Sequence, residues 1–348
     1  MENKLPKISI ISPVFNIIKS GREPFFRQMI ESVHNQTYTN IEHIVQDGGS
    51  TDGTIEILKE YADKGWITFY SEKDKNVHDA INKAFDKISG SFFGILGSDD
   101  YYKSPDMIED VVQNFILKTN PDYVYGDQEN ISATDGSPIF LWRGDGYINE
   151  FWRGVSYNTL SMFFSKKMFE EIGRFDINYP VVADLKLQMK MRFDDYTGAY
   201  CNRIITVFRE GIGLSSQEDT LFYHKNEYAE ICYEIWKKFD ASLAVEDGEY
   251  MIKYNYYPEK FLMRLRRYII GLKLKNLDYI KFNRYIEEKI NFFASSSNKK
   301  TEAAKIKQYN KVYIRLFTLF PIVKITRKGN VIHVFLFGFI PVLKIKKS

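Results

Sequence analysis

The sequence predicts an α/β protein with a Rossmann-like, mostly parallel sheet flanked by helices, followed by a helical region and a short basic, apolar, hairpin-like tail. Two observations support this fold class. Short apolar runs rich in β-branched residues alternate with segments of helical periodicity through residues 1–100. The links between them are short and rich in Gly, Pro, Ser and Asp. Such alternation is typical of a parallel sheet with helices on both faces.

The individual elements follow from local patterns. Residues 7–14 (KISIISPV) are apolar and β-branched up to a proline, which predicts a buried strand. Residues 23–36 carry apolar side chains three and four positions apart, the spacing of one helix face. Residues 47–54 (DGGSTDGT) have the composition of a loop. The same reasoning predicts further strands at 41–46, 66–70 and 92–96, and further helices at 54–61 and 77–88.

Charge is distributed unevenly along the 348 residues, although the net charge is only +3. Residues 1–250 hold 26 Lys and Arg against 40 Asp and Glu, whereas residues 251–348 hold 22 against 5. The acidic part is compatible with a metal-assisted active site, and the basic part suggests an anionic partner surface. Cys201 and Cys232 lack the spacing of a metal site, and residues 1–7 lack a signal-peptide core, so we expect a cytoplasmic protein.

Three of the predicted strands carry candidate site residues at their carboxyl ends: residues 13–16, Asp47, and the pair Asp99 and Asp100. Ligands of open parallel sheets bind outside the carboxyl ends of the strands. Two adjacent carboxylates repel each other unless a cation or hydrogen-bond donors intervene, and hard oxygen ligands suit Mg²⁺ or Mn²⁺. The alternatives are a surface turn for the acidic pair and a local Asx turn for Asp47.

Four stretches carry a resemblance: residues 9–16 (SIISPVFN), 31–54, 71–85 and 92–100 (FFGILGSDD). In order and separation they resemble the family 2 glycosyltransferases, which have the GT-A fold, and in particular bacterial members that build surface polysaccharides. The resemblance is dense over 7–105, traceable to about 215 and absent beyond. It implies the following organisation: a catalytic domain at 1–215 with a donor half (1–105) and an acceptor half (106–215), a helical extension at 216–295, and a linker and basic amphipathic tail at 296–348.

The resemblance also implies a binding site for a UDP-sugar donor. Its residues would be Pro13, Val14, Phe15, Asp47, Asp74, Lys75, Asn82 and Asp99. Among them, Asp47 would accept a hydrogen bond from the base, which favours uracil, and Asp99 would approach the ribose. Asp100 would ligate a Mn²⁺ or Mg²⁺ ion bound to the diphosphate.

A general base is needed because an acceptor hydroxyl is a poor nucleophile at neutral pH. In the family it is a carboxylate shortly after a GxFD segment, here residues 173–176, and the resemblance assigns the role to Asp184. A base on one sugar face and the diphosphate on the other imply inversion at the anomeric carbon. The alternative for Asp184 is a helix cap. Asp194 and Asp195 are the next candidates, although a solvated turn explains them equally.

Two departures from the family pattern affect the acceptor half. Residues 159–162 (TLSM) stand where many relatives have a His-Gln pair, and residues 211–215 (GIGLS) are a looser form of a Gly-Gly motif. Trp142, Trp152 and Tyr157 lie in the segment that shapes the acceptor site in relatives. Aromatic rings are good platforms for sugars and equally good core residues, so both interpretations stand.

The C-terminal third has a different character. Helical periodicity covers 218–239 and 261–274, and the second segment carries a basic cluster: Arg264, Arg266, Arg267 and Lys273. Residues 294–300 predict a linker. Residues 316–325 and 336–345 are copies of one apolar motif on either side of a turn at 327–330.

The longest uncharged stretch of this tail, 329–343, is shorter than the roughly 20 residues of a spanning helix. We therefore expect the tail to lie on an anionic membrane, the inner face of a bacterial plasma membrane, near a lipid-linked or other glycan acceptor. A hairpin packed on the protein or on a second subunit is the alternative.

Other functions fit less well. The basic tail suits nucleic acid, but no RRM, KH, OB or zinc-finger signature occurs, so no nucleic-acid partner is predicted. A nicotinamide dehydrogenase needs a Gly-rich turn after its first strand, and here the first glycine is Gly21. A nucleotidyltransferase would have a Gly-rich, basic loop at the same place. A non-catalytic relative that binds nucleotide-sugars or glycans is the strongest competitor.

Overall fold

The computed structural model describes residues 5–144, 151–153, 157–213, 218–245, 248, 251, 257, 259–275, 277–295, 323–328, 331–336 and 340–346. Contacts divide the chain into two compact units, Met1–Ile286 and Glu287–Ser348. The boundaries predicted at 105, 215 and 295 remain predictions. The linker predicted after residue 295, the first part of the apolar repeat and the turn at 329–330 lie outside the described residues.

The strands of the first unit are β1 (Ile8–Val14), β2 (Ile41–Asp47), β3 (Thr68–Ser71), β4 (Phe92–Ile95), β5 (Tyr101–Tyr102), β6 (Tyr123–Ser132), β7 (Pro138–Trp142), β8 (Met162–Ser165) and β9 (Gly198–Glu210). The helices are α1 (Glu23–His34), α2 (Thr54–Asp63), α3 (Val77–Phe85), α4 (Met107–Val111), η1 (Val112–Ile116), α5 (Leu117–Thr119), η3 (Phe151–Arg153), η4 (Thr159–Ser161), α6 (Lys166–Ile172), α7 (Ala183–Phe193), α8 (Glu218–Trp236), α10 (Glu259–Leu272) and α11 (Tyr279–Ser295). The predicted α/β class is confirmed, and each predicted strand and helix of residues 1–100 is present.

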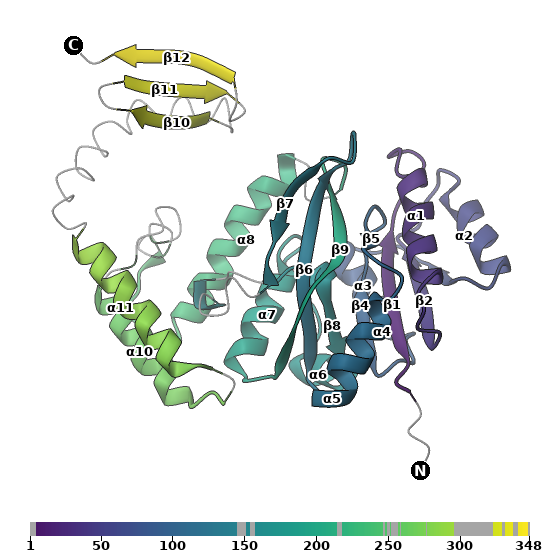
Figure 1. Ribbon diagram of the computed structural model, residues 1–348, viewed down its shortest axis with the longest axis horizontal. Coiled ribbons are helices and arrows are strands. Elements are labelled where there is room, and N and C mark those ends of the chain that lie inside the picture. Colours follow the sequence, from purple (N-terminus) through teal and green to yellow (C-terminus); the bar gives the residue numbers. More distant parts are fainter. Residues whose placement is uncertain are drawn as a thin grey trace. The chain divides into compact units, whose positions relative to one another are not determined.

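The described strands of the first unit form one sheet in the order β3-β2-β1-β4-β8-β6-β9-β5, and β7 pairs with β6 (Figure 1). The pairs β1–β2, β1–β4 and β2–β3 are parallel, as the strand–helix alternation predicts. The other half is mixed, because β8 runs antiparallel to β4 and β6 whereas β9 is parallel to β6. The carboxyl ends of β1, β2, β3 and β4 therefore meet at one edge.

Helices cover both faces of the sheet and create two apolar cores. Residues of α1, α2, α4 and η1 pack on one face against Ile8, Ile10 and Val45. Residues of α3, α6 and α7 pack on the other face against Ile11 and Ile44. Because successive side chains of β1 are buried on opposite faces, the strand is apolar without polar alternation, which is the pattern of residues 7–14.

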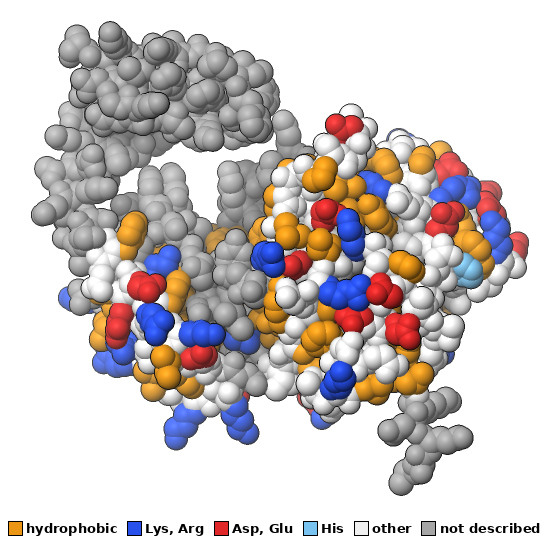
Figure 2. Space-filling view, viewed as in Figure 1, with side chains coloured by type: hydrophobic (Ala, Val, Ile, Leu, Met, Phe, Trp, Pro, Cys, Tyr) orange, Lys and Arg blue, Asp and Glu red, His pale blue; other side chains and the backbone are white. Residues whose placement is uncertain are grey.

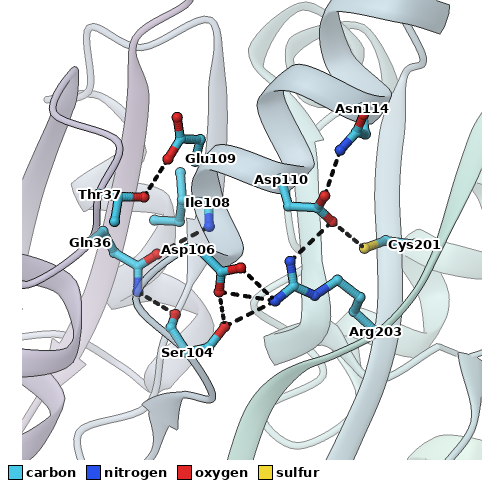
Figure 3. Close-up of polar contacts among 10 residues, drawn as sticks. All are labelled: Gln36, Thr37, Ser104, Asp106, Ile108, Glu109, Asp110, Asn114, Cys201 and Arg203. Atoms are coloured by element: carbon cyan, nitrogen blue, oxygen red, sulfur yellow. Dashed lines mark hydrogen bonds and ion pairs between the residues drawn. The ribbon is translucent and has the colours of Figure 1, made fainter.

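A polar network fixes the segment that follows Asp100 (Figure 3). Gln36, at the end of α1, donates to the Ser104 carbonyl at 2.9 Å and accepts from the Ile108 N–H at 3.1 Å. From β9, Arg203 reaches Asp106 at 3.0 Å and Asp110 at 3.4 Å. The loop between β5 and α4 is thereby tied both to α1 and to β9.

The C-terminal part of the first unit packs on the α7 region through α8. Val182, Leu185 and Met189 of the α7 region pack against Ile231 and Ile235 of α8. The second unit contains a separate antiparallel sheet of β10 (Val323–Lys328), β11 (Val331–Leu336) and β12 (Ile340–Lys346). None of the described helices is long and apolar enough to cross a bilayer.

Candidate active site

Residues from three loops meet at the carboxyl ends of β1, β2 and β3. A Cβ atom added to Gly48, directly after β2, would lie 2.4 Å from the Asp74 carboxylate and 3.3 Å from the ring of Phe15. The absence of a side chain at Gly48 therefore lets Asp74 and Phe15 approach the same loop. The ring of Phe15 is 53% exposed, which leaves a face available for stacking. Burial raises the pKa of Asp74, and the charge of Lys83 opposes this rise.

Asp47 is fully buried at the end of β2 and organises its own loop. Its carboxylate accepts from the N–H groups of Gly49 and Ser50, both at 3.0 Å, and from the hydroxyl of Ser71 at 2.6 Å. The local Asx turn considered for this residue is therefore present. A hydrogen bond to a nucleotide base would require part of this network to open.

The remaining predicted donor residues differ in their surroundings. Val14 is buried in the core on the α1 side, and Pro13 is half-buried. Lys75 is exposed at the start of the α3 region. Asn82 lies within α3, where its side-chain amide donates to the carbonyl of Phe175 at 2.9 Å and accepts from the same residue's N–H at 3.2 Å. Asn82 thus holds the GxFD segment in this structure.

Asp99 and Asp100 lie buried at the tip of β4, with only 6% and 2% of their surface exposed. Burial raises the pKa of both carboxyl groups. For Asp100 the rise is large, and the charge of Asp99 adds to it. For Asp99 the guanidinium of Arg22 opposes the rise. Two partly uncompensated acids at one strand end are an arrangement that a bound cation would stabilise.

Arg22 joins this acidic pair to the loop that follows β1. Its guanidinium donates to the Phe15 carbonyl and to the Ser98 hydroxyl, both at 2.9 Å, and lies 3.7 Å from the Asp99 carboxylate. The side chain is 17% exposed. The tips of β1 and β4 are therefore bridged by one positive charge.

Arg209, near the end of β9, supports the pair from the acceptor half. Its backbone N–H donates to the Asp100 carboxylate at 2.9 Å, and its guanidinium donates to the Asp99 carbonyl. The guanidinium lies over the rings of Phe25 and Tyr101, at 4.5 and 4.8 Å from their centroids. The position of Asp100 thus depends on a residue 109 positions later in the chain.

Two glycines leave room around the acids. A Cβ atom at Gly97 would lie 2.4 Å from Asp100 Oδ2, and one at Gly213 would lie 2.9 Å from Asp99 Oδ2. Across the described ranges, no three His, Cys, Asp or Glu side chains come close enough together to hold a metal ion. Mg²⁺ is commonly held by one or two carboxylates together with substrate phosphates and water. The acidic pair, with its glycine-lined surroundings, fits that kind of site.

Asp184 is the second residue of α7 and is partly buried. One of its oxygens accepts from the Thr159 hydroxyl at 2.8 Å, and the other accepts from the N–H of Leu185 at 2.8 Å. Gln188, one turn later, donates to the same Thr159 hydroxyl at 2.8 Å. The carboxylate is therefore held in one orientation by η4 and by its own helix.

The segment before Asp184 is attached to the donor half through α3. Besides Asn82, Asn76 at the N-terminus of α3 donates to the carbonyl of Ile177 at 3.0 Å. Asn76 comes directly after Lys75 and two residues after Asp74. The chain that leads to Asp184 therefore passes directly beside the start of α3.

The aromatic residues predicted for the acceptor site have different environments. Trp152 is fully buried, and its ring packs against Tyr257 with a centroid distance of 4.9 Å. Tyr157 is 8% exposed and packs against Tyr125 at 4.1 Å. For these two rings the structure favours the core interpretation. Trp142 lies partly exposed at the end of β7.

The other acidic candidates have turn geometry. Asp195 has a positive φ of 62° and accepts from the N–H of Lys275 at 2.6 Å. Asp194 is the C-cap of α7, at the opposite end of that helix from Asp184. The turn interpretation of this pair agrees with these positions.

Three residues that contact the site were not among the candidates: Arg22, Thr159 and Arg209. Neither was Glu227, which accepts from the backbone N–H groups of Val181 and Val182 shortly before Asp184. Thr159 could have been found from the sequence, because it stands where many relatives carry a His-Gln pair. Gly213, from the looser glycine motif, also lies close to the Asp99 carboxylate. Arg22 and Arg209 carry no local pattern, and Glu227 lies beyond the region of resemblance.

Comparison with family models gives a match to Glycosyl transferase family 2 over residues 9–173. Glycosyltransferase GlyA of Streptococcus pneumoniae serotype 4 is 27% identical over 220 residues, which cover 58% of this chain and 30% of that protein. A PGL/p-HBAD biosynthesis glycosyltransferase of Mycobacterium bovis is 27% identical over 217 residues, covering 61% of this chain and 80% of that protein. The chain thus spans less than a third of the first of these relatives.

Solved structures resemble this chain in fold. The crystal structure of S. aureus TarS has a TM-score of 0.54 at 14% identity and covers 95% of this chain and 58% of that one. The structure of S. aureus TarS 1-349 in complex with UDP-GlcNAc has a TM-score of 0.51, also at 14% identity, and covers 96% and 98% of the two chains. At this identity the likeness bears on the fold alone, and it agrees with the GT-A architecture.

Proposed function

Because the chain belongs to glycosyl transferase family 2 through residues 9–173, we propose that it transfers a hexose or N-acetylhexosamine from a UDP-sugar to an acceptor hydroxyl, with inversion. The observation that carries this proposal is the acidic edge of the sheet. Asp99 and Asp100 are buried at the tip of β4, and Arg22 links Asp99 to Phe15, the residue that follows the neighbouring strand β1. A UDP-sugar as donor is also in keeping with the UDP-GlcNAc complex of TarS 1-349.

In the proposed donor site, Phe15 stacks on the base and Asp47 accepts a hydrogen bond from it. Asp74 and Lys75 close the pocket, and Asp99 faces the ribose. Asp100 would hold the Mg²⁺ or Mn²⁺ ion. When bound, the ion would supply positive charge to the departing diphosphate, so that no protonation of the leaving group is needed.

Asp184 is the proposed base. Its carboxylate takes the proton of the acceptor hydroxyl while that oxygen forms its bond to the anomeric carbon. The bond from that carbon to the diphosphate oxygen breaks on the opposite face, which inverts the configuration. Thr159 and the N–H of Leu185 orient the carboxylate for this step.

The test uses purified protein, a panel of UDP-, GDP- and dTDP-sugars, and release of the matching nucleoside diphosphate with Mn²⁺ as the readout. Asp100→Ala should abolish metal-dependent UDP binding. Asp184→Asn should keep donor binding and lower the rate by about two orders of magnitude or more, the scale of losing a positioned base. Equal, negligible release by the unaltered protein and Asp184→Asn would favour the non-catalytic binding relative.

We also propose that the protein works at the inner face of a bacterial plasma membrane, on a lipid-linked or surface-glycan acceptor. The support comes from charge and exposed apolar groups in the C-terminal region. On α10, Met263, Arg267 and Ile270 lie three and four positions apart, and all three are exposed. Figure 2 shows several Lys and Arg side chains, with Asp and Glu side chains between them, over the part of the surface formed by α10 and α11.

The tail was predicted to provide most of this contact. Deleting residues 313–348 should therefore release the protein from vesicles that contain phosphatidylglycerol, while donor binding is kept. Vesicles of phosphatidylcholine alone should bind neither form. Retention of the shortened protein on the anionic vesicles would contradict the membrane role of the tail.

A further inference from the structure

Asp184 is preceded by a short segment, residues 180–182, and a side chain of α8 holds the backbone of its last two residues. Glu227 of α8 accepts from the N–H groups of Val181 and Val182, both at 3.0 Å. Glu227 is 7% exposed, so these bonds are shielded from water. A carboxylate with two backbone donors forms charge-assisted hydrogen bonds, which are stronger than neutral ones.

His78 of α3 packs on the GxFD segment that precedes residues 180–182. Its ring lies on Phe175, with a centroid distance of 5.2 Å. Burial lowers the pKa of this ring, and the charge of Asp184 and the backbone of Pro180 oppose the fall.

Glu227 lies outside the match to the family model and also outside the region of resemblance. Its contacts nevertheless fall on the two residues before the first turn of α7. In addition, Lys186 of α7 pairs with Glu234 of α8 at 3.1 Å, and that carboxylate is 50% exposed. Two acidic residues of one helix thus contact α7, one at its buried start and one at its exposed side.

We propose that Glu227 acts as a clamp on residues 181 and 182 that sets the position of the Asp184 carboxylate. Glu227 is a positioning residue, and this inference rests on the proposed role of Asp184. Asn76 at the start of α3 and Asn82 within it hold the preceding residues 175–177, whereas Glu227 holds the two residues directly before α7. The clamp therefore gives α8 a part in the position of the base.

The test compares Glu227→Leu, Glu227→Gln and the matched control Glu234→Gln, with UDP release from the fastest UDP-sugar of the panel as the readout. Glu227→Leu should lower kcat about tenfold to a hundredfold, the effect of a small misplacement of a reacting group, and leave the donor KM within about twofold. Glu227→Gln should recover most of kcat, because its carboxamide oxygen still accepts hydrogen bonds. Glu234→Gln should behave like the unaltered protein.

Two measurements separate positioning from a loss of folding. UDP affinity and the midpoint of thermal unfolding report whether Glu227→Leu is folded, and Glu227→Asp, one methylene shorter, replaces it if it is not. Combining Glu227→Leu with Asp184→Asn should lower kcat no further than Asp184→Asn alone, because a positioning residue acts only through the base.

Unchanged kcat in folded Glu227→Leu, or effects of the two substitutions that multiply, would overturn the clamp. Neither result would affect the proposed transferase activity as long as Asp184→Asn is inactive. Full activity of Asp184→Asn would instead remove Asp184 as the base, whatever the Glu227 variants do.

Discussion

Replacing Gly97 by alanine tests the geometry of the acidic pair with a single added carbon. The new Cβ atom would lie 2.4 Å from Asp100 Oδ2 and 3.4 Å from Asp100 Cγ. Ordinary contact between such atoms needs about 3.4 Å or more, so the carboxylate oxygen has to move by about 1 Å. Gly97 does not have the left-handed backbone that only glycine adopts readily, so the fold should be kept.

The movement has a cost because Asp100 has little freedom. Its other carboxylate oxygen accepts from the N–H of Arg209 at 2.9 Å, and only 2% of the residue is exposed. A displacement of about 1 Å at a reacting or metal-holding group lowers the rate by about a hundredfold, which corresponds to about 2.7 kcal/mol. Gly97→Ala should therefore weaken Mn²⁺-dependent UDP binding and slow UDP release.

Isothermal titration of UDP with and without Mn²⁺ is the appropriate assay. Gly271→Ala is the matched control, because no heavy atom lies within 4 Å of its added carbon. This control lies in α10 and should bind UDP normally while gaining about 0.5–1 kcal/mol of stability. If Gly97→Ala binds UDP with Mn²⁺ as tightly as the unaltered protein, the Asp100 carboxylate does not hold the ion in the way argued here.

Three further predictions concern stability. Burial lowers the pKa of His43 from 6.5 to about 3, so between these pH values only the unfolded chain binds the proton. The free energy of unfolding therefore falls as the pH falls, by about 2 kcal/mol at pH 5. Urea unfolding of His43→Gln should not show this pH-dependent loss. Trp152→Ala should lower the free energy of unfolding by about 3–5 kcal/mol without raising the acceptor KM of the folded protein, whereas a raised KM at full stability would restore its acceptor role. Gln36→Ala should lower the free energy of unfolding by about 1–3 kcal/mol, because it leaves the buried Ile108 N–H without its acceptor. Asp106→Ala, which removes the half-exposed ion pair with Arg203, should lower it by at most about 1 kcal/mol. Chemical denaturation of these two variants should reproduce that order.

The fold of residues 1–105 could be predicted from sequence because its information is local. Each parallel strand there is a short apolar run, and the residues at or just beyond its end fall at the carboxyl edge, as Asp47 and Asp99 do. Neighbouring strands of the sheet are also near neighbours in the chain, so the strand ends could be combined without knowing long-range contacts.

The fold of residues 106–215 was less predictable, because its contacts join residues far apart in the chain. The strand β9 lies between β6 and β5 in the sheet, an order that no local pattern encodes. The contact of Arg209 with Asp100 spans 109 residues, and that of Glu227 with Val182 spans 45. Composition also failed to separate a sugar-binding ring from a core ring at Trp152, because burial depends on helices far along the chain.

The contacts of Arg209 show that the part of the chain which positions Asp100 extends as far as β9. A protein shortened to residue 173, where the family match stops, would lack β9 and with it the N–H that holds Asp100. The strand β5 would lose its partner in the described sheet. The stretch that sequence comparison recognises is thus smaller than the stretch that must fold together, and a minimal version of this protein has to extend at least through the end of β9.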